Sequence, residues 1–148
     1  ALSACPRAYV VRTSWVFGPG KESFLGAAHR ELLAGREVRA IKDTWASATY
    51  VADLAARVAE IVSRGRHGLY HVVNEGVCSY YEFALEAARL AGLGDEEVKR
   101  LVVPVGEDDK RRAAERPRYT PMRCLLSERL GLAPLRDWRA ALADYAGA

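Results

Sequence analysis

The sequence predicts an α/β fold in which a few strands alternate with helices. A short apolar, β-branched run at 8–11 is typical of a buried strand, and the segment 68–73 is also interpreted as a strand. Between and after them, apolar residues recur at the spacing of one helix face, and glycines separate the segments. A length of 148 residues allows one domain with one modest core. The strands expected are nevertheless few for a sheet that stands alone.

Cap and stop signals set the bounds of the helices. Ser23 is placed to cap the first helix, which Gly35 ends, and Gly65 ends the second. Ser79, with Glu82 three residues on, has the spacing of a capping box at the start of the third. The second helix is expected to bury one apolar face, made of Leu54, Val58, Ile61 and Val62.

The elements follow one another along the whole chain, with no internal repeat and no low-complexity tract. Strands are expected at 8–11, 38–41 and 68–73, with an edge-like strand at 101–104. Helices are expected at 23–34, 50–63, 79–92, from 95 and at 135–145, with a short helical turn at 127–130. Loops or turns are expected at 43–49, 74–76 and 106–120.

Composition excludes several classes of function. No apolar run has the length of a membrane span and no signal-peptide pattern opens the sequence, so neither a membrane nor a secretory route is expected. A net charge of +3 is too small to indicate nucleic-acid binding. Cys5, Cys78 and Cys124 are far apart and show no metal-ligand spacing, which favours a reducing, cytoplasmic setting without a metal site. Since the only methionine is Met122, we expect a chain cut from a longer one.

Polar residues follow the first strand directly. Thr13, Ser14 and Trp15 stand where this strand ends, and ligands of open α/β sheets bind at the carboxyl ends of strands. Trp15 either stacks on a sugar or base or fills the core, and the sequence alone leaves both open. The helix that opens at Ser23 offers free N–H groups to a phosphate. Gly20-Lys21 does not continue as a phosphate-binding loop, because the next residue is glutamate.

Two further groups of residues are candidates for a site. The basic residues at 110–112, with Arg116 and Arg118, either close over a diphosphate or form a solvated loop. Cys78 has no identifiable base nearby in the sequence, so it is not expected to act as a nucleophile.

These motifs, in this order, resemble the dTDP-4-dehydrorhamnose reductases of the extended short-chain dehydrogenase/reductase family. The resemblance begins with Arg-Thr-Ser-Trp-Val-Phe-Gly at 12–18 and covers nearly the whole chain. The other segments that carry it are Asp43, 49–50, 53–55, 68–71, 78–84, 116–117 and 137–142. Several ordered motifs together are much more specific than any one of them.

The resemblance implies the carboxyl-terminal, substrate-binding portion of a Rossmann-type enzyme. Residues 1–20 would supply the last part of the Rossmann sheet and 21–148 the substrate-binding region. The implied cofactor is NADPH or NADH, with Thr13 and Ser14 on the nicotinamide side. The implied substrate is a dTDP-sugar, with Trp15 facing the sugar and with Ser23 and Arg116 meeting the diphosphate. The implied partners are an N-terminal half or a second copy of the chain.

The residues that the family uses for chemistry are absent. The sequence has no Gly-rich dinucleotide loop, and none of its 7 tyrosines is followed by lysine at the fourth position. We therefore assign no catalytic residue and expect no reductase activity from this chain alone. The segments 44–48 and 121–124 also depart from the family pattern, which leaves the identity of the sugar open.

Two other interpretations remain at this stage. One is a non-catalytic relic or partner-binding module that kept the fold, with an apolar surface left for another chain to cover. The other is part of a different nucleotide-sugar enzyme, an epimerase or dehydratase. Such relatives usually carry asparagine where this sequence has Trp15.

Overall fold

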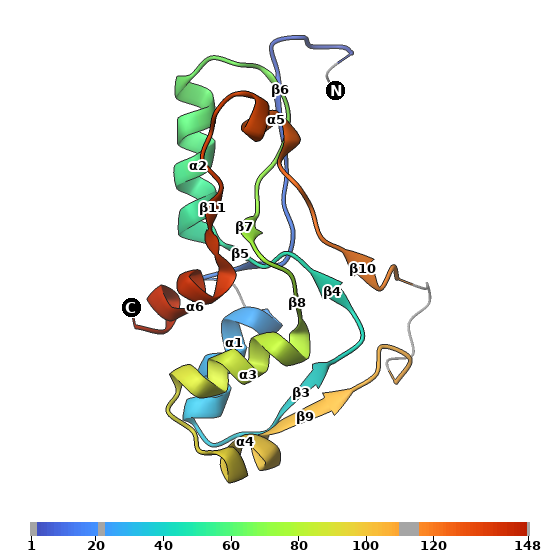
Figure 1. Ribbon diagram of the computed structural model, residues 1–148, viewed down its shortest axis with the longest axis vertical. Coiled ribbons are helices and arrows are strands. Elements are labelled where there is room, and N and C mark those ends of the chain that lie inside the picture. Colours follow the sequence, from blue (N-terminus) through green and yellow to red (C-terminus); the bar gives the residue numbers. More distant parts are fainter. Residues whose placement is uncertain (1–2, 21–22, 110–115, 148) are drawn as a thin grey trace.

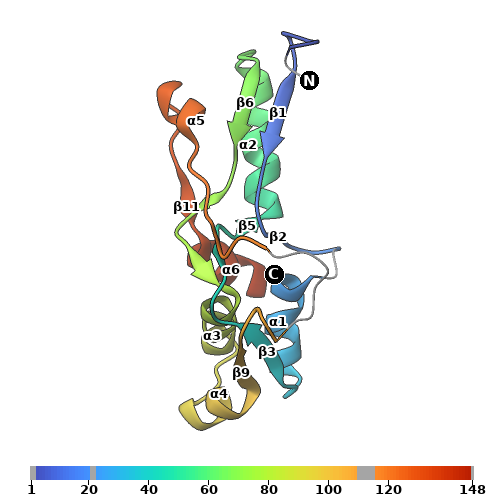
Figure 2. The same cartoon turned by 90° about the vertical axis from the view of Figure 1, so that its right-hand side faces the viewer.

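The computed structural model describes residues 3–20, 23–109 and 116–147 and shows an elongated molecule (Figure 1). One end holds a pair of long parallel strands with a helix beside them, and the other end holds a helical layer with a second strand pair (Figures 1 and 2). Within these residues no helix is both long and apolar enough to cross a membrane. The alternation of strands and helices predicted from the sequence is therefore confirmed.

The first end is built on β1 (Tyr9–Arg12) and β6 (Gly68–His71), which pair in parallel. The helix α2 (Val51–Ser63) lies along this pair, and the short helix α5 (Leu125–Arg129) packs on β6. A small core lies between them, formed by Ile61, Tyr70, Val72 and Leu132. Parallel sheets are normally covered on both faces. Here Val62 of α2 is 52% exposed and Leu69 of β6 is 41% exposed, so this sheet is only partly covered.

The second end is built on α1 (Phe24–Leu33) and α3 (Tyr80–Leu90), which pack side by side. They cover the parallel pair β3 (Val38–Ile41) and β9 (Val102–Val105), with α4 (Asp95–Leu101) leading into β9. The last helix, α6 (Trp138–Ala146), closes this end. The larger core lies here, and its biggest side chains are Trp138, Phe17, Phe83, Leu32 and Leu142.

The capping predictions are confirmed at both packed helices. The Ser23 hydroxyl accepts the N–H of Gly26 at 3.2 Å. At α3, the Ser79 hydroxyl accepts the N–H of Glu82 at 3.1 Å, and the Glu82 carboxylate accepts the N–H of Ser79 at 2.7 Å. This reciprocal arrangement satisfies two backbone donors that a helix start would otherwise leave unpaired.

Four segments differ from their prediction because they form very short strands. The expected loop at 43–49 contains β4 (Trp45–Ala46) and β5 (Thr49–Tyr50), and the expected turn contains β7 (Asn74–Glu75). The start of the expected last helix is β11 (Leu135–Asp137), and the end of the long loop is β10 (Tyr119–Thr120). Strands of two or three residues are too short to show an alternating pattern, so only the fold reveals them.

These short strands connect distant parts of the chain. The strand β2 (Val16–Phe17) pairs in parallel with β5, and β7 pairs in parallel with β11. The strand β4 pairs with β10 on one side and, antiparallel, with β8 (Cys78–Ser79) on the other. On α2 the predicted apolar face is only partly correct, because the helix buries Arg57 and Ile61 but leaves Val62 exposed.

A buried polar cluster joins α2, β7 and β11 where the two ends of the molecule meet. Asn74 is 1% exposed. Its side-chain oxygen accepts the N–H of Tyr50 at 2.8 Å, and its amide donates to Asp53 at 2.7 Å and to the Arg136 carbonyl at 3.1 Å. The Arg136 guanidinium in turn binds both carboxylate oxygens of Asp53, at 2.9 and 3.0 Å.

The Asp53 carboxyl gives this cluster a pH dependence. Burial raises its pKa, but hydrogen bonds from Arg136 and Asn74, with the charge of Arg136, outweigh burial and hold the pKa below its ordinary value of 3.8. The contribution of the Asp53 carboxylate to the free energy of unfolding is therefore complete above pH ~4. It is lost as the pH falls through the lowered pKa of the folded state. We expect Asp53→Asn to lower the urea midpoint by a constant amount from pH 7 to pH 5 and by a shrinking amount below pH ~4.

The control is Asp144→Asn, which removes an exposed carboxylate that meets the same guanidinium. It is expected to change the midpoint little at any pH, as exposed ion pairs usually do. If the change in urea midpoint caused by Asp53→Asn stays constant down to pH 3, stability is not coupled to protonation of Asp53 as described.

Candidate functional site

An open hollow of about 310 Å³ lies beside the bend between β1 and β2. It is lined by Thr13, Ser14, Trp15 and Val16 from the bend, by Ser23, Phe24 and Leu25 at the start of α1, and by Tyr80 at the start of α3. We call it the Trp15 hollow. The structure thus brings together Thr13, Ser14, Trp15 and Ser23, which the sequence predicted as site residues, at the carboxyl end of β1.

Trp15 has an unusual backbone conformation. Its φ is 36°, and it is the only non-glycine residue with a positive φ in the described part of the chain. This left-handed conformation costs an ordinary residue about 1–2 kcal/mol. The bend is held in place because the Trp15 carbonyl accepts the N–H of Thr49 at 3.2 Å and Val16 then pairs with β5. Strained residues of this kind cluster at binding sites.

The Trp15 indole lies on the Tyr80 ring. The ring centroids are 3.8 Å apart and the planes are inclined by 23°. Phe24 meets Tyr80 edge-on, with centroids 5.2 Å apart. Trp15 is half-buried and packs at the margin of the larger core while it also lines the hollow. Trp15 therefore combines the two roles left open by the sequence, because its side chain packs against the core and also lines the hollow.

Ser23 contributes mainly through the helix that it caps. Its hydroxyl is already engaged by the N–H of Gly26. The first turn of α1 carries no acidic side chain that would repel an anion. A phosphate at this helix start would therefore meet the unpaired backbone N–H groups and the positive end of the helix dipole.

Arg116 does not line the Trp15 hollow. It is exposed, and it forms no ion pair with any residue in the described ranges. Two residues on, the Arg118 guanidinium binds Asp43 at 2.6 Å and Asp108 at 2.7 Å, which ties this segment to the loop after β3. The basic residues at 110–112 lie outside the described residues, so the prediction that they close over a diphosphate stays untested.

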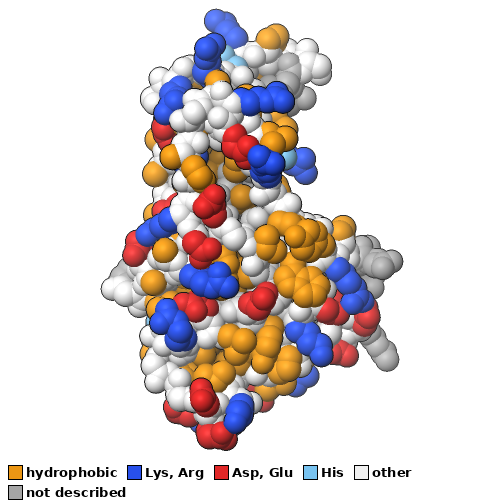
Figure 3. Space-filling view, viewed as in Figure 1, with side chains coloured by type: hydrophobic (Ala, Val, Ile, Leu, Met, Phe, Trp, Pro, Cys, Tyr) orange, Lys and Arg blue, Asp and Glu red, His pale blue; other side chains and the backbone are white. Residues whose placement is uncertain are grey.

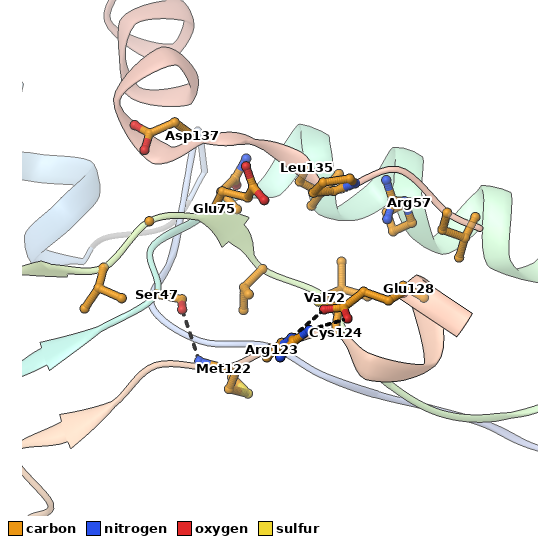
Figure 4. A pocket seen from close by; sticks show the side chains of 17 residues that line it. Ser47, Arg57, Val72, Glu75, Met122, Arg123, Cys124, Glu128, Leu135 and Asp137 are labelled. Carbon is orange, nitrogen blue, oxygen red and sulfur yellow. Dashed lines mark hydrogen bonds and ion pairs between the residues drawn. The ribbon is translucent and has the colours of Figure 1, made fainter. Parts of the chain in front are cut away.

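A second and larger cavity, of about 660 Å³, was not predicted (Figure 4). Its walls come from the segments 72–77, 122–128 and 132–137, with Ser47 and Arg57. Much of its polar lining is paired internally. The Met122 N–H donates to Ser47 at 3.2 Å, and Arg123 binds Glu128 through two contacts of 2.8 Å. Because the walls are far apart in sequence, no local pattern marks this cavity.

Nucleophilic and metal chemistry find little support in the described residues. Burial raises the pKa of the Cys78 thiol to about 12, with the Glu82 charge as a further cause, so no useful thiolate fraction forms near neutral pH. Burial also raises the pKa of Cys124. In the part of the chain that the structure describes, no group of His, Cys, Asp or Glu side chains is arranged to hold a metal ion. Basic and acidic side chains are interspersed on the face seen in Figure 3.

Tyr80 and Phe24 are lining residues that the sequence interpretation did not select. Tyr80 follows the capping serine of α3, so its place in the first turn of that helix was predictable. Its contact with Trp15, 65 positions away in the chain, was not.

Solved structures with a similar fold show which class of protein this chain resembles. The chain superposes on dTDP-4-dehydrorhamnose reductase from Bacillus anthracis, solved in complex with NADP, with a TM-score of 0.82 and 29% identity; the match covers 93% of this chain and 47% of that one. The reductase from Clostridium acetobutylicum gives a TM-score of 0.80 at 28% identity, over 96% of this chain and 49% of that one. The fold is that of a partial, Rossmann-like α/β unit from the extended short-chain dehydrogenase/reductases.

Sequence comparison gives the same result. A dTDP-4-dehydrorhamnose reductase from Mycolicibacterium smegmatis is 40% identical, over 99% of this chain and 44% of its own length. The spore coat polysaccharide biosynthesis protein SpsK of Bacillus subtilis is 34% identical, over 92% of this chain and 46% of its own length. The family described as the RmlD substrate binding domain matches residues 1–148, and the chain belongs to that family. It spans about half the length of the curated relatives that it matches.

Proposed function

We propose that this chain is the substrate-binding portion of an NADPH-dependent dTDP-4-dehydrorhamnose reductase and that it binds the nucleotide-sugar at the Trp15 hollow. The observation that carries the proposal is that Thr13, Ser14, Trp15 and Ser23 line one open hollow at a strand's carboxyl end. The indole supplies a flat apolar surface for a sugar ring, and the start of α1 supplies N–H groups for the diphosphate. Three of the four proteins named above are called dTDP-4-dehydrorhamnose reductase, those from Mycolicibacterium smegmatis, Bacillus anthracis and Clostridium acetobutylicum.

The main binding site of the cofactor, and the tyrosine that donates a proton to the sugar in this family, would have to come from residues outside this chain. When bound, NADPH supplies the hydride that reduces the keto carbon of the sugar. Thr13 and Ser14 fit a role in one wall of that site, because both line the Trp15 hollow and carry hydroxyl groups that can bind the carboxamide of a nicotinamide. The chain's own task is therefore to bind and orient the sugar and the diphosphate, with Arg116 as a diphosphate contact that reaches in from its exposed loop.

We further propose that the partly covered sheet is completed by other strands. Among the described residues β1 pairs only with β6, so its second edge presents unpaired backbone groups. The apolar side chains Leu69 and Val62 are exposed on the same sheet and its helix. The relatives are about twice as long as this chain, which favours an N-terminal half as the occupant over a second copy.

The test is a calorimetric titration of the chain with dTDP and with dTDP-glucose. Trp15→Ala is expected to weaken dTDP-glucose binding about tenfold and to leave dTDP binding within about twofold, because it removes the ring on which the sugar packs. Arg116→Ala is expected to weaken dTDP binding about tenfold, through loss of a charge-assisted contact to the diphosphate.

The matched control is Arg129→Ala, which removes an exposed arginine at the far end of α5. It is expected to bind dTDP as the unaltered chain does. If the unaltered chain does not bind at millimolar dTDP, the preformed site is wrong and the relic or partner-binding interpretation is favoured.

A further inference from the structure

The contact between Trp15 and Tyr80 carries an inference beyond the proposed binding site. Trp15 lies on a bend whose neighbours Thr13 and Ser14 are themselves only partly covered, and its backbone is strained. The indole packs at the margin of the larger core and also lines the hollow. The stacked Tyr80 ring, 3.8 Å away between centroids, restricts the indole to one orientation.

Tyr80 itself is rigidly placed. It is the first residue of α3, directly after the capping box formed by Ser79 and Glu82. Ser79 also belongs to β8, where it pairs with Trp45 of β4. Phe24, from the start of α1, meets the Tyr80 ring edge-on at an interplanar angle of 86°. The Tyr80 ring is therefore fixed by its own helix, by a short sheet and by a second helix.

We propose that Tyr80 is a positioning residue, which holds the indole of Trp15 with one face covered and so presents it, already ordered, to the sugar ring of a nucleotide-sugar in the hollow. The proposal rests on the proposed function, since it concerns the same site. Pre-ordering matters because a side chain that must be immobilised on binding reduces affinity. Tyr80 would thus strengthen binding of the sugar without being its main contact.

The experiment compares two ligands, dTDP and dTDP-glucose, on Tyr80→Leu, Tyr80→Phe and Tyr81→Leu. Tyr80→Leu keeps an apolar side chain but removes the ring. It is expected to weaken dTDP-glucose binding about threefold to tenfold and to leave dTDP binding within about twofold, as expected for loss of one aromatic pair that orders the sugar contact. Tyr80→Phe keeps the ring and is expected to restore dTDP-glucose binding. Tyr81→Leu removes a neighbouring ring that does not line the hollow and is expected to bind both ligands normally.

A second readout needs no ligand. The indole N–H resonance of Trp15, assigned by its loss in Trp15→Phe, is expected to shift in Tyr80→Leu because the ring current of Tyr80 is lost, and to stay in place in Tyr81→Leu. An unchanged resonance overturns the proposal whether or not the chain binds nucleotide. Equal weakening by Tyr80→Leu and Tyr81→Leu, or none by Tyr80→Leu, also overturns it. If the unaltered chain binds neither ligand, the proposed function fails while a shifted resonance still supports the ordering role of Tyr80.

Discussion

Asn74→Ala is expected to lower the free energy of unfolding by about 2–4 kcal/mol, since the substitution removes the partner of two half-buried backbone groups and one of the two partners of the Asp53 carboxylate. The side chain is 1% exposed and makes three hydrogen bonds, to the N–H of Tyr50, to Asp53 and to the Arg136 carbonyl. Chemical denaturation, with the slope checked for a two-state transition, measures the loss.

The matched control for Asn74→Ala is Glu75→Ala at the next position. Glu75 belongs to the same short strand but is exposed, so its removal is expected to change stability by no more than about 0.5 kcal/mol. A loss below about 1 kcal/mol for Asn74→Ala would mean that the cluster does not join the two ends of the molecule as described.

Gly18→Ala is expected to destabilise the chain by about 2–5 kcal/mol, through two separate effects. The φ of Gly18 is 148°, a conformation that side-chain-bearing residues rarely adopt. A Cβ at this position would also overlap Cγ1 of Val51 and lie 3.1 Å from its Cβ. Val51 opens α2, so the helix has to shift to relieve the overlap.

A double-mutant cycle separates the two effects. Gly18→Ala is expected to cost less in a Val51→Ala background, where Cγ1 is absent, and the remaining cost measures the backbone strain. Gly35→Ala serves as a control for strain alone, because Gly35 has a φ of 68° with nothing within 4 Å of an added Cβ. Additive losses in the cycle would contradict a clash with Val51.

The sequence predicted well those features that repeat or occur locally. The helices around Phe83 and Ile61 follow from apolar spacing and from cap or stop signals, and the strand at 38–41 follows from its alternation of apolar and polar residues. The family resemblance then assigned Thr13 and Ser14 to the cofactor and Trp15, Ser23 and Arg116 to the substrate. The structure brings all of these except Arg116 to one hollow.

The features that the sequence did not predict depend on contacts between distant segments. Two-residue strands such as β5 and β7 become strands only through partners that lie far along the chain, and no periodicity marks them. The buried guanidinium of Arg57 binds the Ala133 carbonyl at 2.6 Å, 76 positions along the chain, as well as the nearby Glu60 at 3.0 Å. Tyr80 could be placed on its helix from the sequence, but its stacking on Trp15 depends on how two segments pack.

The division of the buried residues into two cores has a consequence for how affinity is set. Tyr9 and Val11 of β1 pack with the smaller core, while Trp15 and Phe17 pack with the larger one. The residues between them, Thr13 and Ser14, therefore connect two units, each with its own core, and we expect the unit with the smaller core to open at the lower free-energy cost. The apparent affinity for the ligand is then proportional to the fraction of molecules in which both units are closed. A chain that binds the smaller unit and stabilises its closed form would therefore raise the affinity of the Trp15 hollow without contacting the ligand. The two binding events would then show positive thermodynamic coupling.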